Sequence, residues 1–183
     1  MSQAISLLVV LIPLLLTLVL TFVYLSIFLS VFSLAPWVPS RRRDLKRAIG
    51  LSDLKAGEVF ADLGCGDGRV VFAANKFWGA RAKGIELAWP LHLFCQVKKH
   101  LFYRQRDIVF KCGNLFREDL SGIDVVFVYG LPGSLKKRLK GKLETELKSG
   151  ARVISYGFAI EGLEPAKISR PDKKHSPVFV YKF

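Results

Sequence analysis

The stretch VFADLGCGDGRV, residues 59–70, decides the fold of this chain. It opens as an apolar run that carries one acid, Asp62, a pattern typical of a buried strand. It then places glycine at every second position, at Gly64, Gly66 and Gly68, and continues as RVVFAANKFW with helical spacing. Because glycine has no Cβ, such a turn can bend sharply and let a ligand approach main-chain N–H groups. Strand, glycine turn and helix together predict a ligand-binding loop.

Strand-like and helical patterns alternate along the rest of the chain after residue 45. The run 123–130 is the most apolar strand and is expected at the centre of the sheet. In the helical pattern at 88–102, Leu91, Phe94, Val97 and Leu101 share one face. Such alternation predicts a parallel sheet covered on both faces. The expected strands are 58–64, 80–87, 107–114, 123–130 and 151–160, and the expected helices are 46–58, 69–78, 88–102 and 131–150.

Two further strand-like runs, 167–171 and 176–183, end the chain with only the loop DKKH between them. Strands joined so closely pair antiparallel or leave the sheet. The last run, VFVYKF, is apolar enough to be fully buried. We therefore expect an α/β fold with a mostly parallel seven-stranded sheet that ends in an antiparallel hairpin.

The first forty residues predict a membrane anchor. Residues 4–35 are apolar almost throughout, no charge precedes Arg41, and about 20 apolar residues suffice to span a bilayer. A cleaved signal peptide is disfavoured because the segment is too long and has no basic start. A hairpin of two short spans would need a polar turn where only Thr17 and Thr21 stand. We expect one helix, kinked at Pro13, and a division into an anchor with its interface (1–40) and a catalytic domain (41–183).

Charge predicts which side of the membrane the domain occupies. Residues 41–47 hold five basic side chains against one acid, so the positive-inside rule places the domain on the cytoplasmic side, or at the mitochondrial inner membrane in a eukaryote. The net charge of +13 belongs entirely to this domain. It suits an anionic lipid surface or an acidic partner, and charge alone does not exclude nucleic acid. Three cysteines without metal-like spacing predict reduced thiols and no metal site.

The motif around Asp62 resembles the first motif of class I S-adenosylmethionine-dependent methyltransferases, which have a Rossmann-like fold. The resemblance implies that the loop binds the methionine part of this cofactor and that Asp62 or Asp67 orients its amino group. A dinucleotide loop is disfavoured because Asp67 would stand where a pyrophosphate needs neutral N–H donors. The loop residues carried over as cofactor-binding are Asp62, Gly64, Cys65, Gly66, Asp67 and Gly68.

The ends of the second and third strands extend this resemblance. Glu86 follows the glycines by about twenty residues, where a carboxylate can accept hydrogen bonds from both ribose hydroxyls. At Asn114, many family members place an acid for the adenine amino group, and the amide oxygen can replace it. Leu87 and Leu115, which follow these two residues, complete the predicted cofactor site.

The predicted catalytic residues are Tyr129, Gly130, Leu131 and Pro132, directly after the central strand. Methyltransferases that act on nucleic-acid bases often have a polar Asn or Asp here, and its absence makes a nucleic-acid substrate unlikely. GDGRVVFAA, the run Glu86-Leu87-x-Trp89-Pro90 and the basic helix after Pro132 instead resemble small membrane-anchored protein-lysine methyltransferases. These are related to the mitochondrial enzymes that modify the ATP synthase c subunit and the adenine nucleotide translocase.

This narrower resemblance implies methyl transfer to a lysine of a membrane-associated protein. Tyr129 and the carbonyls of Gly130 and Leu131 would orient the amine, with deprotonation through water. Trp89 is expected over the cofactor, along the lysine channel or in the core. Two alternatives stay open: a methyltransferase for a lipid or another small molecule at the membrane, and a cofactor-binding module without catalysis. The sequence indicates no oligomeric state.

Overall fold

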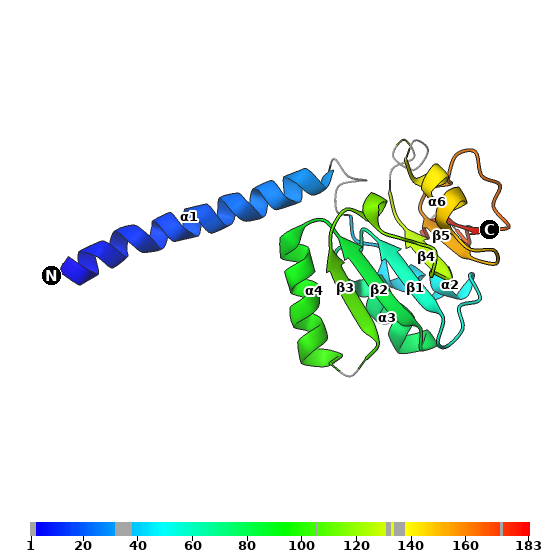
Figure 1. Ribbon diagram of the computed structural model, residues 1–183, viewed down its shortest axis with the longest axis horizontal. Coiled ribbons are helices and arrows are strands. Elements are labelled where there is room, and N and C mark those ends of the chain that lie inside the picture. Colours follow the sequence, from blue (N-terminus) through cyan, green and yellow to red (C-terminus); the bar gives the residue numbers. More distant parts are fainter. Residues whose placement is uncertain (1–2, 32–37, 105, 131–132, 134–137, 173) are drawn as a thin grey trace.

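A seven-stranded sheet with the order β3-β2-β1-β4-β5-β7-β6 forms the centre of the domain (Figure 1). The computed structural model describes residues 3–31, 38–104, 106–130, 133, 138–172 and 174–183. The first five strands in this order run parallel, and β7 pairs antiparallel with β5 and with β6. The expected α/β topology and its terminal hairpin are confirmed, and β4 is central as predicted. The strands are β1 (Val59–Leu63), β2 (Arg81–Glu86), β3 (Ile108–Cys112), β4 (Val125–Val128), β5 (Arg152–Tyr156), β6 (Lys167–Ser169) and β7 (Val178–Lys182).

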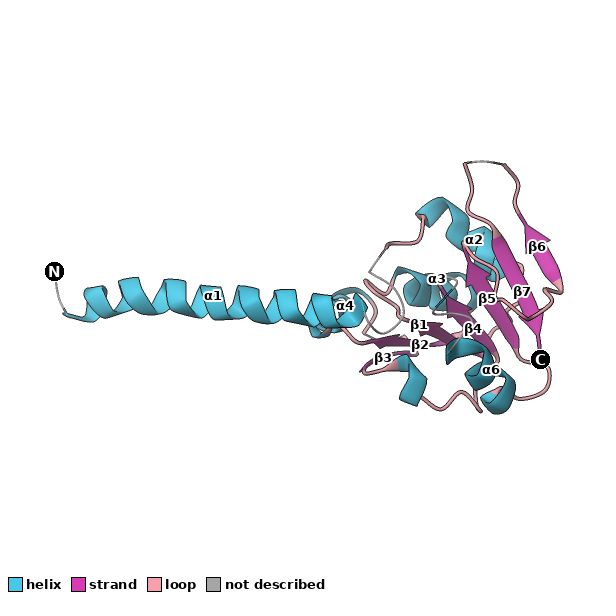
Figure 2. Cartoon of the chain, turned by 90° about the horizontal axis from the view of Figure 1, so that it is seen from above, coloured by secondary structure: helices cyan, strands magenta, loops and turns pink. Residues whose placement is uncertain are grey.

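Helices cover both faces of this sheet (Figure 2). Alternate residues of β1 show why: Phe60 packs against the helices of one face, whereas Ala61 and Leu63 join the core of the other. Nearly all side chains of β1 and β4 are buried, as expected for strands covered on both sides. One face carries α2 (Arg42–Gly50), α3 (Arg69–Trp78) and α4 (Trp89–Phe102), and the other carries the 3-10 turn η1 (Leu115–Arg117) and α6 (Lys140–Glu146).

Several predicted element ends were wrong. The lead-in helix begins at Arg42 and ends at Gly50, before the sequence pattern does. The strand expected at 151–160 stops at Tyr156 because Gly157 turns the chain with a φ of +87°. Of the helix expected at 131–150, the described part is helical only to Glu146. The last strand is not fully buried: Phe179 is half-buried and Lys182 is exposed.

A buried carboxylate fixes α2 to the end of the sheet. Asp44 accepts hydrogen bonds from the Tyr156 hydroxyl at 2.8 Å and from the Ser176 N–H at 3.2 Å. Arg47 donates to Asp44 at 3.1 Å and to the Ser176 carbonyl at 2.6 Å. Burial raises the pKa of Asp44, but these hydrogen bonds outweigh it and hold the pKa below its usual value. Part of the basic segment 41–47 therefore clamps α2 to the β6–β7 connection.

Helix α1 (Gln3–Val31) extends away from the domain as one continuous helix (Figure 1). Within it, Ile5–Leu25 is long and apolar enough to cross a membrane, and none of this window is buried in the protein. The hydroxyl of Thr17 donates to the Pro13 carbonyl at 2.8 Å and that of Thr21 donates to the Thr17 carbonyl at 2.9 Å. No polar turn therefore interrupts the described helix. Residues 32–37 of the predicted anchor segment lie outside the described residues.

Candidate active site

The glycine turn between β1 and α3 has a backbone that only glycine adopts readily. Gly64, Gly66 and Gly68 have φ values of +83°, +55° and +73°. At Gly68 a Cβ would also lie 2.9 Å from the Phe110 ring and 3.0 Å from the Cys95 sulfur. The spacing noticed in the sequence thus reflects both the turn geometry and the close packing of β3 and α4 beneath it.

The N–H groups of this turn are used within the protein. Gly64 and Cys65 both donate to the Ile85 carbonyl at 2.9 Å, and Gly66 donates to the Glu86 carboxylate at 2.7 Å. The approach of a ligand to the main chain of this turn stays a prediction. A pyrophosphate would find few donors here, which argues against a dinucleotide loop.

Asp62, at the end of β1, presents a buried carboxylate to the pocket above the turn. No hydrogen bond from the described residues stabilises its charged form. Burial, and after it the charges of Glu86 and Asp67, raise the pKa of Asp62 well above its usual value. A cationic group in the pocket would stabilise the charged carboxylate against burial and against the charges of Glu86 and Asp67. The site therefore fits the ammonium group of an amino-acid ligand.

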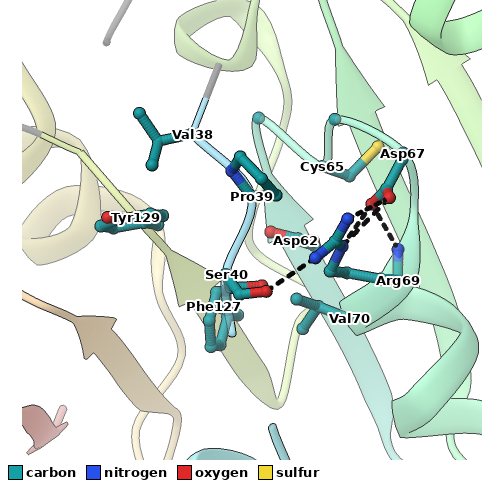
Figure 3. A pocket seen from close by; sticks show the side chains of 12 residues that line it. Val38, Pro39, Ser40, Asp62, Cys65, Asp67, Arg69, Val70, Phe127 and Tyr129 are labelled. Carbon is teal, nitrogen blue, oxygen red and sulfur yellow. Dashed lines mark hydrogen bonds and ion pairs between the residues drawn. The ribbon is translucent and has the colours of Figure 1, made fainter. Parts of the chain in front are cut away.

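The second predicted acid, Asp67, is held by a neighbouring arginine (Figure 3). Arg69 donates to the two carboxylate oxygens of Asp67, with Nη2 at 2.6 Å, and its Nη1 reaches the Ser40 carbonyl at 2.8 Å. Burial raises the pKa of Asp67, but the hydrogen bonds from Arg69 outweigh it and lower the pKa. Arg69 therefore connects the glycine loop to the chain segment that precedes α2.

This segment, residues 38–40, forms one wall of the pocket beside Asp62 and Tyr129 (Figure 3). The cavity volume is about 30 Å³, well below the roughly 300–1,000 Å³ found for small-molecule sites. Sequence reasoning missed this wall, because nothing local indicates that 38–40 returns to a motif more than twenty residues away. Arg69 directly follows the glycine motif and was a detectable candidate. The lining residues that were not predicted are Val38, Pro39, Ser40, Arg69, Val70 and Phe127.

The residues predicted for the ribose and adenine do not line this pocket. The Glu86 carboxylate accepts from the N–H groups of Gly66 at 2.7 Å and Ala88 at 2.8 Å, and burial raises its pKa. The amide oxygen proposed for adenine, on Asn114, accepts from the Phe116 N–H at 2.9 Å. Leu87, next to Glu86, is partly exposed, and Leu115 is buried in the core. The cofactor roles of these four residues stay predictions.

Tyr129 follows β4 and lines the pocket. Its ring meets Tyr156 edge-on at 5.0 Å, and a Cβ at Gly157 would lie 3.0 Å from it. Its hydroxyl has no hydrogen-bond partner among the described residues. The next predicted residue, Gly130, is buried, and the predictions for 131 and 132 fall outside the described residues.

Comparison with known proteins places this geometry among methyltransferases. The family model of the ANTKMT methyltransferase domain matches residues 62–167, more than half of the chain. A protein-lysine N-methyltransferase of Saccharolobus islandicus (strain REY15A) is 30% identical and aligns with 81% of this chain and 92% of its own length. The adenine nucleotide translocase lysine N-methyltransferase of Mus musculus is 29% identical over 73% of this chain, which spans only 57% of that relative.

A solved structure shares the fold at similar identity. It is an RNA methyltransferase from Salinibacter ruber in complex with S-adenosyl-L-homocysteine. The two chains superpose with a TM-score of 0.72 at 31% identity, covering 79% of this chain and 93% of that one.

Proposed function

Since this chain belongs to the ANTKMT methyltransferase family and is a class I S-adenosylmethionine-dependent methyltransferase, we propose that it methylates a lysine of a membrane-associated protein. In this proposal α1 anchors the enzyme in the membrane as a single span, with the domain on the cytoplasmic side or its organellar equivalent. The main support is that residues 38–40, which lead from α1 into the domain, form a wall of the pocket with Asp62 and Tyr129.

Bound S-adenosylmethionine supplies an electrophilic methyl group. On this chain, the Asp62 carboxylate would hold the ammonium group of the cofactor, because it lies in the pocket wall and burial disfavours its charge without a compensating cation. The bend at Gly64 and Gly66 keeps side chains away from the pocket floor. The Asp67–Arg69 pair would close the site against residues 38–40.

A lysine must lose its proton before it can accept a methyl group, since its usual pKa is about 10.4. Burial against apolar surface favours the neutral amine, and the pocket offers Val38, Pro39 and Phe127 for this purpose. The Tyr129 hydroxyl would orient the amine, with water taking the proton. Most of the rate enhancement would then come from alignment and desolvation.

Tyr129→Phe tests the role of this hydroxyl. The variant keeps the ring against Tyr156, so S-adenosylhomocysteine binding should be unchanged. We expect turnover to fall by about 10-fold to 100-fold, the range for losing one orienting hydrogen bond. Unchanged turnover would remove the hydroxyl from the mechanism.

A second substrate class is RNA, because the Salinibacter relative is an RNA methyltransferase and the domain carries a net charge of +13. Against it, Tyr129-Gly130 follows β4 without the polar side chain expected for gripping a nucleic-acid base.

One experiment separates these substrates. The purified full-length enzyme is incubated with methyl-labelled cofactor and with membranes, extracted lipid or total RNA from cells that lack the enzyme. We expect label in protein that survives ribonuclease and lipid extraction and that yields methyl-lysine on hydrolysis. Label recovered only in RNA or only in lipid would replace the proposal, and the same incubations without enzyme provide the control.

A further inference from the structure

The outward face of α4 is apolar. Trp89, Leu93, Val97 and Leu101 follow one another at intervals of four, so they form one stripe along the helix. Their exposed fractions are 46%, 44%, 48% and 65%. Cys95, on the opposite side, is completely buried beneath the helix. Phe94, which is 51% exposed, widens the stripe.

This pattern inverts the usual arrangement of a surface helix. An amphipathic helix on a sheet turns its apolar side chains to the core and its polar ones to water. In α4 the sequence predicts one apolar face that includes Leu91, Val97 and Leu101, yet only Leu91 is partly covered by the domain. A contiguous exposed apolar surface usually marks an interaction site.

The stripe continues directly from the spanning helix. The Trp89 ring meets the Phe22 ring of α1 edge-on at 5.7 Å, and Phe22 lies near the end of the apolar window Ile5–Leu25. With α1 in a bilayer, Trp89 therefore lies at the boundary between lipid tails and headgroups, where tryptophan is enriched. Trp89 is half-exposed and therefore not a core residue.

The direction of α4 suits the same surface. Helix α4 crosses the direction of α1 in Figure 1, and it is seen nearly end-on beside the end of α1 in Figure 2. When α1 crosses the bilayer, α4 therefore lies along its surface. Basic side chains gather at the far end of α4 and just after it, where anionic headgroups would meet them: Lys99, Arg104 and Arg106.

We propose that α4 is an interfacial membrane helix whose stripe, defined as Trp89, Leu93, Val97 and Leu101, is immersed in the cytoplasmic leaflet. This inference rests on the proposed anchoring by α1. A second copy of the chain would also cover an apolar stripe, but a dimer contact would not require its continuity with α1. Two attachments, α1 and α4, would fix the tilt of the domain, whereas α1 alone would leave it free to rotate.

Depth-dependent quenching tests this placement in the full-length protein. The exposed Cys112 is replaced by serine, and Cys65 and Cys95 are buried, so a fluorescent NBD probe reacts with an introduced cysteine. Three single variants are reconstituted in vesicles of phosphatidylcholine and phosphatidylglycerol, with and without nitroxide-labelled lipid. They are Val97→Cys on α4, Leu15→Cys on α1, and Ile168→Cys on β6, an exposed apolar position that serves as the matched control.

The inference expects nitroxide lipid to quench the probes at positions 15 and 97 by about twofold or more, and the probe at 168 hardly at all. Quenching at 15 without quenching at 97 would overturn the α4 inference and leave the anchoring intact. No quenching at 15 would overturn both. Quenching at 97 should also be lost in the Leu93→Glu variant and kept in Ile168→Glu; persistence in Leu93→Glu contradicts the stripe.

Discussion

Asp62 combines a stability cost with a binding role at a single residue. Its carboxylate is buried in the pocket wall and burial raises its pKa, so ionising Asp62 in the ligand-free protein costs stability. For Asp62→Asn we expect S-adenosylhomocysteine to bind about 10-fold to 100-fold more weakly, the range for losing a charge-assisted hydrogen bond. We also expect the ligand-free variant to melt at a higher temperature. Isothermal titration calorimetry and thermal melting measure the two effects.

The pH dependence of both effects follows from the raised pKa of Asp62. An acid whose pKa is raised by folding destabilises the fold only at pH values above its pKa in the unfolded chain, which is near 3.8 for Asp62. The higher melting temperature of Asp62→Asn should therefore disappear as the pH falls to that value. Ligand affinity should rise with pH until the raised pKa is passed, with a proton released on binding below it. Glu144→Gln, on the exposed side of α6, is the control and should change neither. A pH-independent affinity would contradict this assignment.

Gly68→Ala separates steric contact from backbone strain. Gly68 and Gly150 both have positive φ, +73° and +84°, but only at Gly68 would a Cβ meet neighbours, the Phe110 ring and the Cys95 sulfur. We expect Gly150→Ala to lower the free energy of unfolding by about 1 kcal/mol and Gly68→Ala by about 2–4 kcal/mol. Urea unfolding measures both. Equal losses would show that the contact at Gly68 is unimportant.

For single residues, the sequence predicted the site residues that lie within the glycine motif itself. Asp62 and the glycines were found because the turn that they form is local. Ser40 was not, since its role depends on a chain reversal that brings the segment before α2 onto α3. The side chains of Glu86 and Asn114 also have partners within the protein. Glu86 accepts a hydrogen bond from the Gly66 N–H and Asn114 accepts one from the Phe116 N–H, and the spacing of residues in the sequence does not indicate either bond.

Among the elements, the segment 38–40 depends on one side chain for its place over the pocket. Arg69 bonds Asp67 through one edge of its guanidinium group and the Ser40 carbonyl through Nη1. A lysine cannot hold both at once, because its single ammonium group lacks the planar fork. For Arg69→Lys we expect S-adenosylhomocysteine to dissociate about 3-fold to 10-fold faster, measured by stopped-flow fluorescence.

Hydrogen exchange supplies the structural readout for this variant. The amides around Ser40 should exchange faster in Arg69→Lys. Arg81→Lys is the matched control, because Arg81 donates to the Gly57 carbonyl at the opposite end of the sheet. Faster dissociation without faster exchange near Ser40 would mean that Arg69 acts only through Asp67.

The elements were predictable in type and order but not in extent. Short, nearly continuous apolar runs predicted the strands, because a parallel sheet buries both of its faces. Helix ends depend on tertiary contacts: α2 begins early, at Arg42, where Asp44 can reach Tyr156 and Ser176 from the sheet. The apolar face of α4 was visible as a pattern, but periodicity cannot tell whether such a face meets a core or another surface.

For the whole molecule, attachment to membranes should depend on apolar contact and not on charge. The apolar window of α1 lies outside the folded domain, whereas charges on the domain are screened by salt. We expect the full-length protein to stay with membranes in 1 M salt, where the screening length is about 3 Å, and in alkaline carbonate. Detergent should release it. Extraction by carbonate alone would contradict a spanning α1, and a known peripheral protein in the same sample is the control.

The short link between α1 and the pocket limits how far from the membrane a methyl-accepting side chain can lie. Only six residues, and therefore seven Cα–Cα steps, separate Val31, the last residue of α1, from Val38 at the pocket. An extended chain covers at most about 3.5 Å per residue, so they reach roughly 25 Å. With α1 in the bilayer as proposed, the length of this link would set the distance of the active site from the membrane. The enzyme would then modify side chains close to the lipid surface and leave identical side chains unmodified on domains that project far from it.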